Sequence, residues 1–241
     1  DVVPEMSTLG VPEGIIEVLL HPWLKGGGLI MVCGETGQGK STTCAAVVKE
    51  RMLKHGSFCL TVEDPPEMPL HGQHGNGRCL QTEVKSGKFA EAMKGAMRCY
   101  PTVRGSLLYV GETRDAETAA EVLRVATNGH LVLTTLHAEN LLSAIKRFKS
   151  LAMSEMPESE VNSIFSSSLR LALHQKLDEV KTGSGRKRKL KVDFLVSDPI
   201  SSVAQAIRRG EIESINNDIS MQKLTLQQRG AAALLGQWKF D

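Results

Sequence analysis

The feature that most constrains the fold is the octapeptide 34–41, Gly-Glu-Thr-Gly-Gln-Gly-Lys-Ser, which matches the pattern G-x-x-x-x-G-K-[ST] in full. An apolar run precedes it and a segment of helical period begins near Ser41. Glycines let the backbone turn so that successive N–H groups point at one place, and the first turn of a helix adds the positive end of its dipole. The octapeptide therefore predicts a phosphate-cradling loop between a strand and a helix of an α/β fold.

Such a loop predicts ATP and Mg²⁺ as cofactors. Lys40 supplies a mobile positive charge for the β- and γ-phosphates, and the hydroxyl of Ser41 is a ligand for Mg²⁺. The alternative is a glycine-rich turn that binds nothing. The predicted nucleotide-binding residues are Gly34, Glu35, Thr36, Gly37, Gln38, Gly39, Lys40, Ser41 and Thr42.

Short apolar runs alternate with longer segments of helical period from Gly28 onward, the pattern of a parallel sheet covered by helices. Asp115 is the expected N-cap of one helix. Two stretches break the alternation: residues 64–87 predict an irregular excursion, and residues 181–189 predict an exposed, mobile basic loop. The expected strands are 29–33, 58–62, 107–110, 131–135 and 192–196, and the expected helices are 41–54, 88–98, 116–127, 141–151, 158–177, 203–209 and 224–235.

The composition is that of an ordinary globular protein. Of 241 residues, 41% are apolar and 23% charged, which excludes a wholly disordered chain, and a net charge of +2 gives no reason to expect nucleic acid as a partner. No apolar run has the ~18 residues of a membrane span, and the start lacks the features of a signal peptide. The five cysteines have no Cys-x-x-Cys spacing and predict reduced thiols inside a cell.

Carboxylates follow two of the expected strands. Glu112 follows 107–110 and Glu63 follows 58–62, so both should lie at the carboxyl edge of the sheet, where ligands bind in such folds. One would hold the metal, and the other would orient the attacking water. Glu67 competes with Glu63 for the second role. A histidine stands at each end of the strand 131–135, and His130 and His137 are either structural or sensors of the γ-phosphate.

Four segments resemble, in order, the Walker A, Asp box, Walker B and His box of the type II/type IV secretion and pilus ATPases. They are 34–43, 60–67, 110–118 and 129–137. Residues 206–210, Ala-Ile-Arg-Arg-Gly, are similar to the Ala-Ile-Arg-Ala-Gly motif of the pilus-retraction (PilT-like) branch. Three features depart from the family: the Asp-Pro-Asp before Walker B is lost, the tetracysteine zinc module is absent, and the N-terminal domain is missing. In the first of these features, the chain is closer to the Dot/Icm-type secretion and conjugation relatives.

The resemblance implies roles for single residues. It places Lys40 and Ser41 at phosphate and metal, and it makes Glu63 the general base. Glu112 would lie near Mg²⁺, with His130 and His137 sensing nucleotide across a ring of subunits. Arg114 and Glu117 match the family's R-D-x-E-T and would couple the site to neighbouring subunits.

The resemblance also implies an architecture: a RecA-like P-loop NTPase core with a parallel-rich sheet and a C-terminal helical region. Residues 1–27 are expected to be a linker from an N-terminal domain, 28–180 the core, and 181–241 a basic loop, a strand and a helical region. Because the chain starts without Met, it is expected to be processed or to be a piece of a longer protein.

The implied activity is that of an ATP-hydrolysing homo-hexameric motor for pilus retraction, or for a related secretion or conjugation machine. It would work in the cytoplasm of a bacterium against a platform protein at the inner membrane, without a membrane segment of its own. Two rivals stay open: a nucleotide-dependent assembly switch with little hydrolysis, and a ring that translocates DNA. The presence of both Glu63 and Glu112 favours hydrolysis.

Overall fold

The fold is built on one mixed sheet, in a computed structural model that describes residues 2–85, 87–100, 105–182 and 185–235. The strand order is β3-β4-β2-β5-β6-β1-β7-β8, and only the two outermost pairs, β3 with β4 and β7 with β8, are antiparallel. The predicted α/β fold with a parallel-rich sheet is thereby confirmed. The strands are β1 (Gly28–Cys33), β2 (Phe58–Glu63), β3 (Gly72–His74), β4 (Gly77–Glu83), β5 (Leu107–Val110), β6 (Leu131–Leu136), β7 (Leu169–Thr182) and β8 (Gly185–Val196).

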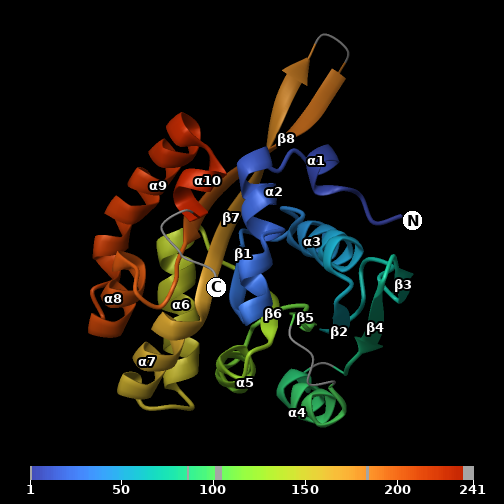
Figure 1. The fold of residues 1–241 in the computed structure, drawn as a ribbon, viewed down its shortest axis with the longest axis vertical. Helices are drawn as coiled ribbons and strands as arrows, with labels where there is room; N and C mark the ends of the chain where they lie inside the picture. Colours follow the sequence, from blue (N-terminus) through green and yellow to red (C-terminus); the bar gives the residue numbers. More distant parts are fainter. Residues whose placement is uncertain (1, 86, 101–104, 183–184, 236–241) are drawn as a thin grey trace.

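Helices cover both faces of the sheet (Figure 1). One face packs against α4 (Phe89–Cys99), α5 (Ala116–Thr127), α6 (Leu141–Met153), α7 (Glu158–Ser168), α8 (Ser202–Arg209), η2 (Ile212–Ser214) and the start of α9 (Ile215–Arg229). The other packs against α1 (Met6–Leu9), α2 (Glu13–Leu19), η1 (Pro22–Gly26), α3 (Lys40–His55) and α10 (Ala231–Leu235). None of the described helices is long and apolar enough to cross a bilayer.

The central strand β1 is buried along its whole length, as expected for a parallel strand covered on both sides. Its alternate side chains divide between the two cores: Leu29 and Met31 lie in one, Ile30 and Val32 in the other. Cys33 is buried at its end, and Cys44, Cys59 and Cys79 are likewise buried free thiols, as predicted for these four. The side chain of Cys99 lies outside the described residues.

Residues 2–27, expected as a linker, contribute to the second core. Met6 of α1 and Ile15 and Leu19 of α2 are fully buried. From α3, the buried Arg51 donates through Nη1 to the carbonyl oxygen of Leu19 at 2.5 Å, which satisfies a carbonyl left open at the end of α2. This burial lowers the pKa of Arg51 to about 10. The segment and the sheet therefore share one apolar interior.

The irregular excursion expected at 64–87 is wrong in its second half, where β3 and β4 form a hairpin. β4 pairs in parallel with β2 over six residues. Gly77 begins β4 at a point where a Cβ would lie 2.7 Å from the carbonyl oxygen of Ser57. The strand was missed because many of its side chains are polar and its apolar content is low, although it pairs with a neighbour on each side.

The helix expected at 158–177 is also wrong beyond Ser168. The chain turns there into β7, whose inner residues pair with β1, so tertiary pairing overrides the local helical period. The expected helix 224–235 is two helices, α9 and α10, which meet at Gly230, and α9 already begins at Ile215. The strand expected at 192–196 is the end of β8, which already begins at Gly185. The remaining predicted helices and strands are found within a few residues of their expected ends.

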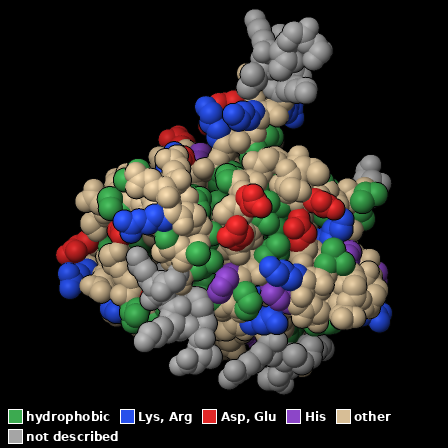
Figure 2. Space-filling model, turned by 45° about the horizontal axis from the view of Figure 1, so that its top comes forward, with side chains coloured by type: hydrophobic (Ala, Val, Ile, Leu, Met, Phe, Trp, Pro, Cys, Tyr) green, Lys and Arg blue, Asp and Glu red, His purple; other side chains and the backbone are tan. Residues whose placement is uncertain are grey.

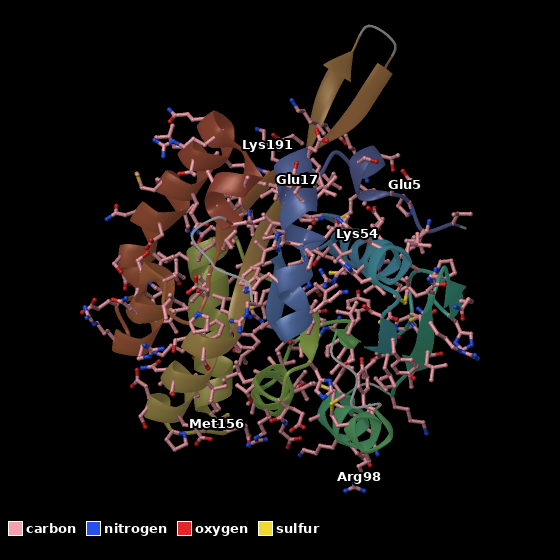
Figure 3. The ribbon with its side chains drawn as sticks, in the orientation of Figure 1. Glu5, Glu17, Lys54, Arg98, Met156 and Lys191 are labelled. Carbon is pink, nitrogen blue, oxygen red and sulfur yellow. The ribbon has the colours of Figure 1, made fainter. Side chains whose placement is uncertain are left out.

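The basic segment 181–189 is not a loop in its described part. β7 and β8 form a long antiparallel hairpin in continuous register from Leu171↔Val196 to Thr182↔Gly185, and it projects from the body (Figure 1). Lys and Arg side chains gather where the hairpin leaves the body (Figure 2). Lys191, near the base of the hairpin (Figure 3), pairs with Asp178 across the two strands at 2.5 Å. The expected boundary at 180/181 thus falls inside one structural unit.

The expected cap of α5 is confirmed and supports a prediction. Asp115 accepts from the backbone N–H of Thr118 at 2.8 Å and from its hydroxyl at 2.9 Å. Asp115→Ala should lower the free energy of unfolding by about 1 kcal/mol, because it leaves an N–H of the first turn unpaired. Denaturant unfolding measures this. Asp115→Asn keeps the acceptor, and a loss as large in that variant would show that the cap is not the cause.

Candidate functional site

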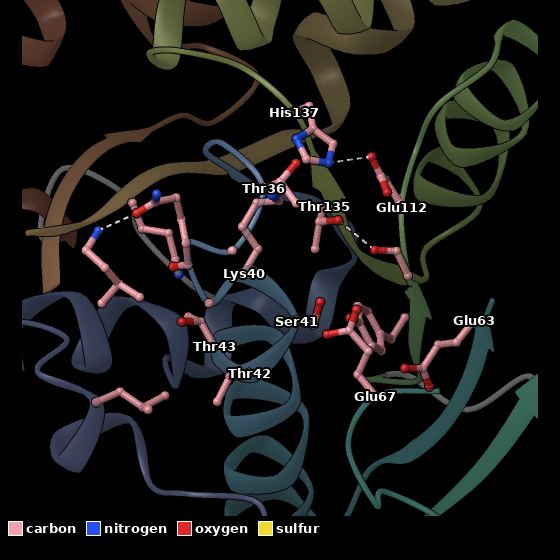
Figure 4. Close-up of a pocket in the computed structure, with 18 of the residues that line it drawn as sticks. Thr36, Lys40, Ser41, Thr42, Thr43, Glu63, Glu67, Glu112, Thr135 and His137 are labelled. Carbon is pink, nitrogen blue, oxygen red and sulfur yellow. Dashed lines mark hydrogen bonds and ion pairs between the residues drawn. The ribbon is translucent and has the colours of Figure 1, made fainter. Parts of the chain in front are cut away.

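A pocket of about 530 Å³ lies where β1, β2, β5 and β6 end. These strands are parallel, so their carboxyl ends meet at one edge of the sheet. The loop 34–39 and the start of α3 form its floor, and residues after β2, β5 and β6 form one wall (Figure 4). It is lined by Leu9, Thr36, Gly37, Gln38, Gly39, Lys40, Ser41, Thr42, Thr43, Glu63, Asp64, Pro65, Glu67, Phe89, Tyr109, Gly111, Glu112, Arg114, Thr135, His137, Gln175, Leu177, Arg188 and Leu190.

The backbone geometry of the loop requires glycine at two positions. Gly34 has φ +151°, and a Cβ there would lie 2.4 Å from the carbonyl oxygen of Gln175 on β7. Gly39 has φ +78° and is the N-cap of α3. L side chains rarely adopt such angles, so both positions require glycine. The result is a tight loop whose following helix points its N-terminus into the pocket.

Lys40 is buried at the head of α3. Its ammonium group donates to the carbonyl oxygens of Gly34 at 3.0 Å and Glu35 at 2.8 Å. Burial lowers its pKa, against the charges of Glu112 and Glu67, which raise it. An ammonium group has three donors. The loop therefore holds this cation in place and leaves it able to bind a further oxygen.

Gln38 ties the loop to β7 by two hydrogen bonds. Its side-chain Oε1 accepts from the backbone N–H of Leu177 at 2.6 Å, and its carbonyl oxygen accepts from Nε2 of Gln175, also at 2.6 Å. Gln175 is buried. The sequence had given Gln38 as a binding residue, but it offered no signal for Gln175 or Leu177, because their role depends on pairing across the sheet.

Glu63 ends β2 and is only 3% exposed. Nε2 of Gln81, from β4, donates to its Oε1 at 2.9 Å. Burial raises the pKa of Glu63, and the nearby charge of Glu67 raises it further, while hydrogen bonds from Gln81 and Thr61 act in the opposite direction. Glu67 lines the same wall (Figure 4). The structure thus brings both candidate bases to the pocket.

Glu112, after β5, has two side-chain partners, an arginine and a histidine. Nε of Arg114 contacts its Oε2 at 2.6 Å, and Nε2 of His137 lies 3.2 Å from its Oε1. Burial lowers the pKa of His137, as does the charge of Lys40, whereas Glu112 raises it. The histidine at the end of β6 therefore sits in the pocket as a neutral imidazole next to the carboxylate at neutral pH.

His130 lies elsewhere. It precedes β6, which runs parallel to β1. His130 therefore lies at the edge of the sheet opposite the carboxyl ends that form the pocket. Its Nδ1 is 2.8 Å from the hydroxyl of Ser106, and its ring packs edge-on to Tyr100 at 4.9 Å between centroids. Within this chain the structure does not bring His130 to the pocket, so its geometry is that of a histidine with structural partners.

The donor set suits magnesium. The described residues hold no cluster of three or more His, Cys, Asp or Glu side chains arranged as metal ligands. Mg²⁺ commonly takes only one or two protein ligands and fills its shell with phosphate oxygens and water. Ser41 and Glu112 line the same pocket, and Ser41 shares a hydrogen bond with the buried Tyr109 of β5. Tyr109 is a further pocket residue that the sequence had not singled out.

The loop, the helix start and the strand-end carboxylates define a P-loop domain with a RecA-like α/β core. Residues 2–228 match the model of the family described as type II/IV secretion system protein, and the chain belongs to this family.

Several relatives share this architecture. The type IV pilus retraction ATPase PilT of Pseudomonas aeruginosa is 32% identical over 218 residues, which are 86% of this chain and 59% of PilT. The crystal structure of the pilus retraction motor PilT with bound ADP has a TM-score of 0.77 at 30% identity and covers 93% of this chain and 64% of that chain. The ATPase DotB of Legionella pneumophila has a TM-score of 0.71 at 27% identity, covering 96% and 60%. The chain spans 61% and 52% of the first two curated relatives it matches.

The raised pKa of Glu63 gives a testable pH dependence. Folding favours its protonated form, so the carboxyl costs nothing below its unfolded pKa, about 4.3, and destabilises the fold as the pH rises through the folded value. Glu63→Gln stays neutral. Its free energy of unfolding relative to wild type should therefore increase from pH 4 to pH 8. Denaturant unfolding across this range measures it, with the exposed Glu155→Gln as the matched control, and a constant difference would contradict the burial effect.

Proposed function

We propose that this chain is the motor domain of an ATP-hydrolysing homo-hexamer that powers retraction of a type IV pilus or a related secretion or conjugation machine. The observation that carries the proposal is the pocket: a P-loop lysine, Lys40, faces a cavity whose wall holds the two strand-end carboxylates Glu63 and Glu112. Family membership and the names of the relatives, a pilus retraction ATPase and the ATPase DotB, support the motor and its machine.

Nucleotide binding would use the loop as a cradle. The PilT relative was solved with bound ADP, and the same loop is present here at 34–41. Backbone N–H groups and the start of α3 would contact the phosphates, and Lys40 would add a positive charge. In water-attack chemistry on a phosphate, positioning and charge neutralisation supply most of the rate. The loop would position the phosphates, and Lys40 would neutralise part of their charge.

Glu63 is proposed as the group that orients the water and accepts its proton. It is buried and accepts a hydrogen bond from Gln81, and burial raises its pKa, which suits a general base. Glu112 is proposed on the metal side. Both of its oxygens already have side-chain partners, Arg114 and His137, so a role through the water shell of Mg²⁺ fits the geometry. The bound Mg²⁺ would neutralise charge on the phosphates.

The two candidate bases can be separated by turnover. Glu63→Gln keeps the shape and the bond from Gln81 but removes the proton acceptor, so ATP turnover in the assembled oligomer should fall by about 10²-fold or more. Mg-ATP affinity should change little. Glu67→Gln, measured beside it, should keep most of the turnover. A near-normal Glu63→Gln enzyme beside an inactive Glu67→Gln enzyme would reverse the assignment, and a wild type that binds but never turns over ATP would favour the assembly switch.

The helix α8 offers a surface for the driven machine. Its inner residues Ala206 and Ile207 are buried, whereas Arg208 and Arg209 are exposed at its end, before Gly210. Arg208 donates to the carbonyl oxygen of Pro199 at 3.4 Å. Two cations at a helix C-terminus complement the dipole. This favourable interaction with the helix dipole is a structural role for one or both arginines. Because the side chains are exposed, their charge is also available to a partner.

We expect Arg208→Ala with Arg209→Ala to abolish motor function in cells while ATP turnover stays above half of wild type. The arginines are exposed and far from the residues of the nucleotide pocket, so their loss should cost only a few tenths of a kcal/mol of stability. Twitching or transfer assays report the motor, and phosphate release reports turnover. Lys223→Ala, an exposed cation on α9, is the control. A parallel loss of turnover would show that the motif is catalytic or structural.

A further inference from the structure

The amide of Gln81 connects the end of β2 with the chain that follows it. Gln81 lies on β4, which pairs in parallel with β2. Its Nε2 donates to Oε1 of Glu63 at 2.9 Å and to the carbonyl oxygen of Met68 at 2.7 Å. Its Oε1 accepts from the backbone N–H of Leu70 at 3.1 Å and from that of His71 at 3.3 Å. One side chain thus joins a carboxylate of the pocket to the backbone downstream of it.

These four bonds use the whole hydrogen-bonding capacity of the Gln81 side chain. A primary amide has two N–H donors, and its oxygen has two lone pairs. The surroundings also fix its orientation. If the amide were turned over, its oxygen would face a carboxylate and a carbonyl, and its NH₂ group would face two backbone N–H groups. A polar group with every bond made is rigid, so Glu63 is held against a fixed donor.

The chain between these two attachment points forms a wall of the nucleotide pocket. It runs from Glu63 to Met68 and carries Glu67, and both glutamates lie on the same wall (Figure 4). The backbone of Glu63 is held as well, because its carbonyl oxygen accepts from the N–H of Val84 at 2.8 Å. Gln81 therefore bonds directly to the carboxylate of Glu63, whereas beside Glu67 it bonds to the backbone.

We propose that Gln81 is a positioning residue for ATP hydrolysis, which fixes the carboxylate of Glu63 and the pocket wall that follows it. This rests on the proposed role of Glu63 as general base. A base acts only within hydrogen-bond reach of the attacking water, and a displacement of about 1 Å can lower the rate by about 10²-fold. Gln81 does not itself line the pocket. It acts through Glu63, so its loss affects turnover far more than nucleotide affinity.

The test is a double-mutant cycle between Gln81→Met and Glu63→Gln in the assembled oligomer. Methionine keeps the length of the side chain but forms none of the four bonds, so ATP turnover should fall about tenfold or more. The affinity for Mg-ATP, measured by calorimetric titration, should stay within about twofold of wild type. In the Glu63→Gln background the same substitution should lower turnover by less than about twofold, because the group that Gln81 positions is already gone.

A second variant keeps the test valid if Gln81→Met folds poorly. Gln81→Glu retains an acceptor for the N–H groups of Leu70 and His71 but places an oxygen opposite Glu63, so the same pattern of losses is expected. The matched control is Gln73→Met. Gln73 is an exposed glutamine on β3 whose Nε2 donates to the carbonyl oxygen of Gly75, and its variant should turn over ATP as the wild type does.

The other outcomes overturn the proposal. Equal losses in both backgrounds would show that Gln81 supports the pocket independently of Glu63. A loss of Mg-ATP affinity as large as the loss of turnover would assign Gln81 to binding instead, and unchanged turnover in both Gln81 variants would show that its bonds have no role in the reaction. If Glu63→Gln alone turns over ATP normally, the proposed base fails and the positioning role fails with it. That result comes from a protein with Gln81 intact, so it differs from every failure of the positioning role alone.

Discussion

The parallel pairing of β1 with β6 on one side and with β7 on the other fixes the position of the phosphate loop relative to His137 and Gln175. The pairing with β6 brings the end of that strand, and so His137, level with the start of the loop: Cys33 lies opposite Leu136, and Gly34 donates to the Leu136 carbonyl at 3.3 Å. The pairing with β7 places Gln175 against Gly34. Because β1 is buried throughout, water does not compete for these ladders. A shift of register here would separate the loop from both of its walls.

The pocket concentrates charge of both signs in a small space. Lys40 is balanced by Glu112 and Glu67, and Glu112 by Arg114, whereas Glu63 has neutral hydrogen-bond donors. Unpaired buried carboxylates are costly, and this one persists because Gln81 and Thr61 offset part of the cost. This difference distinguishes the two strand-end carboxylates: Glu112 has an arginine as a partner, whereas burial raises the pKa of Glu63.

Local sequence was enough to predict the loop, Glu63 and Glu112, because each follows a short apolar run whose direction in a parallel sheet is certain. For the histidines the sequence had left open whether each is structural or a sensor. His137 follows β6 and lines the pocket, whereas His130 precedes β6 and lies at the other edge of the sheet. Gln81, Gln175 and Leu177 act only through pairing between distant segments, and no local pattern marks them. The helical period at 169–177 was misleading, because a strand buried between β1 and β8 can have the same spacing of apolar residues.

The two hydrogen bonds of Gln38 join the loop to β7 at a point from which the hairpin runs outward. With no room for a side chain at Gly34, the loop cannot slide along that strand, so the two move as one body. From Leu177 to Thr182 the strand extends about 17 Å at ~3.4 Å per residue. The hairpin is therefore anchored at the loop. A rotation of a few degrees about this anchor displaces the far end of β7 in proportion to that length.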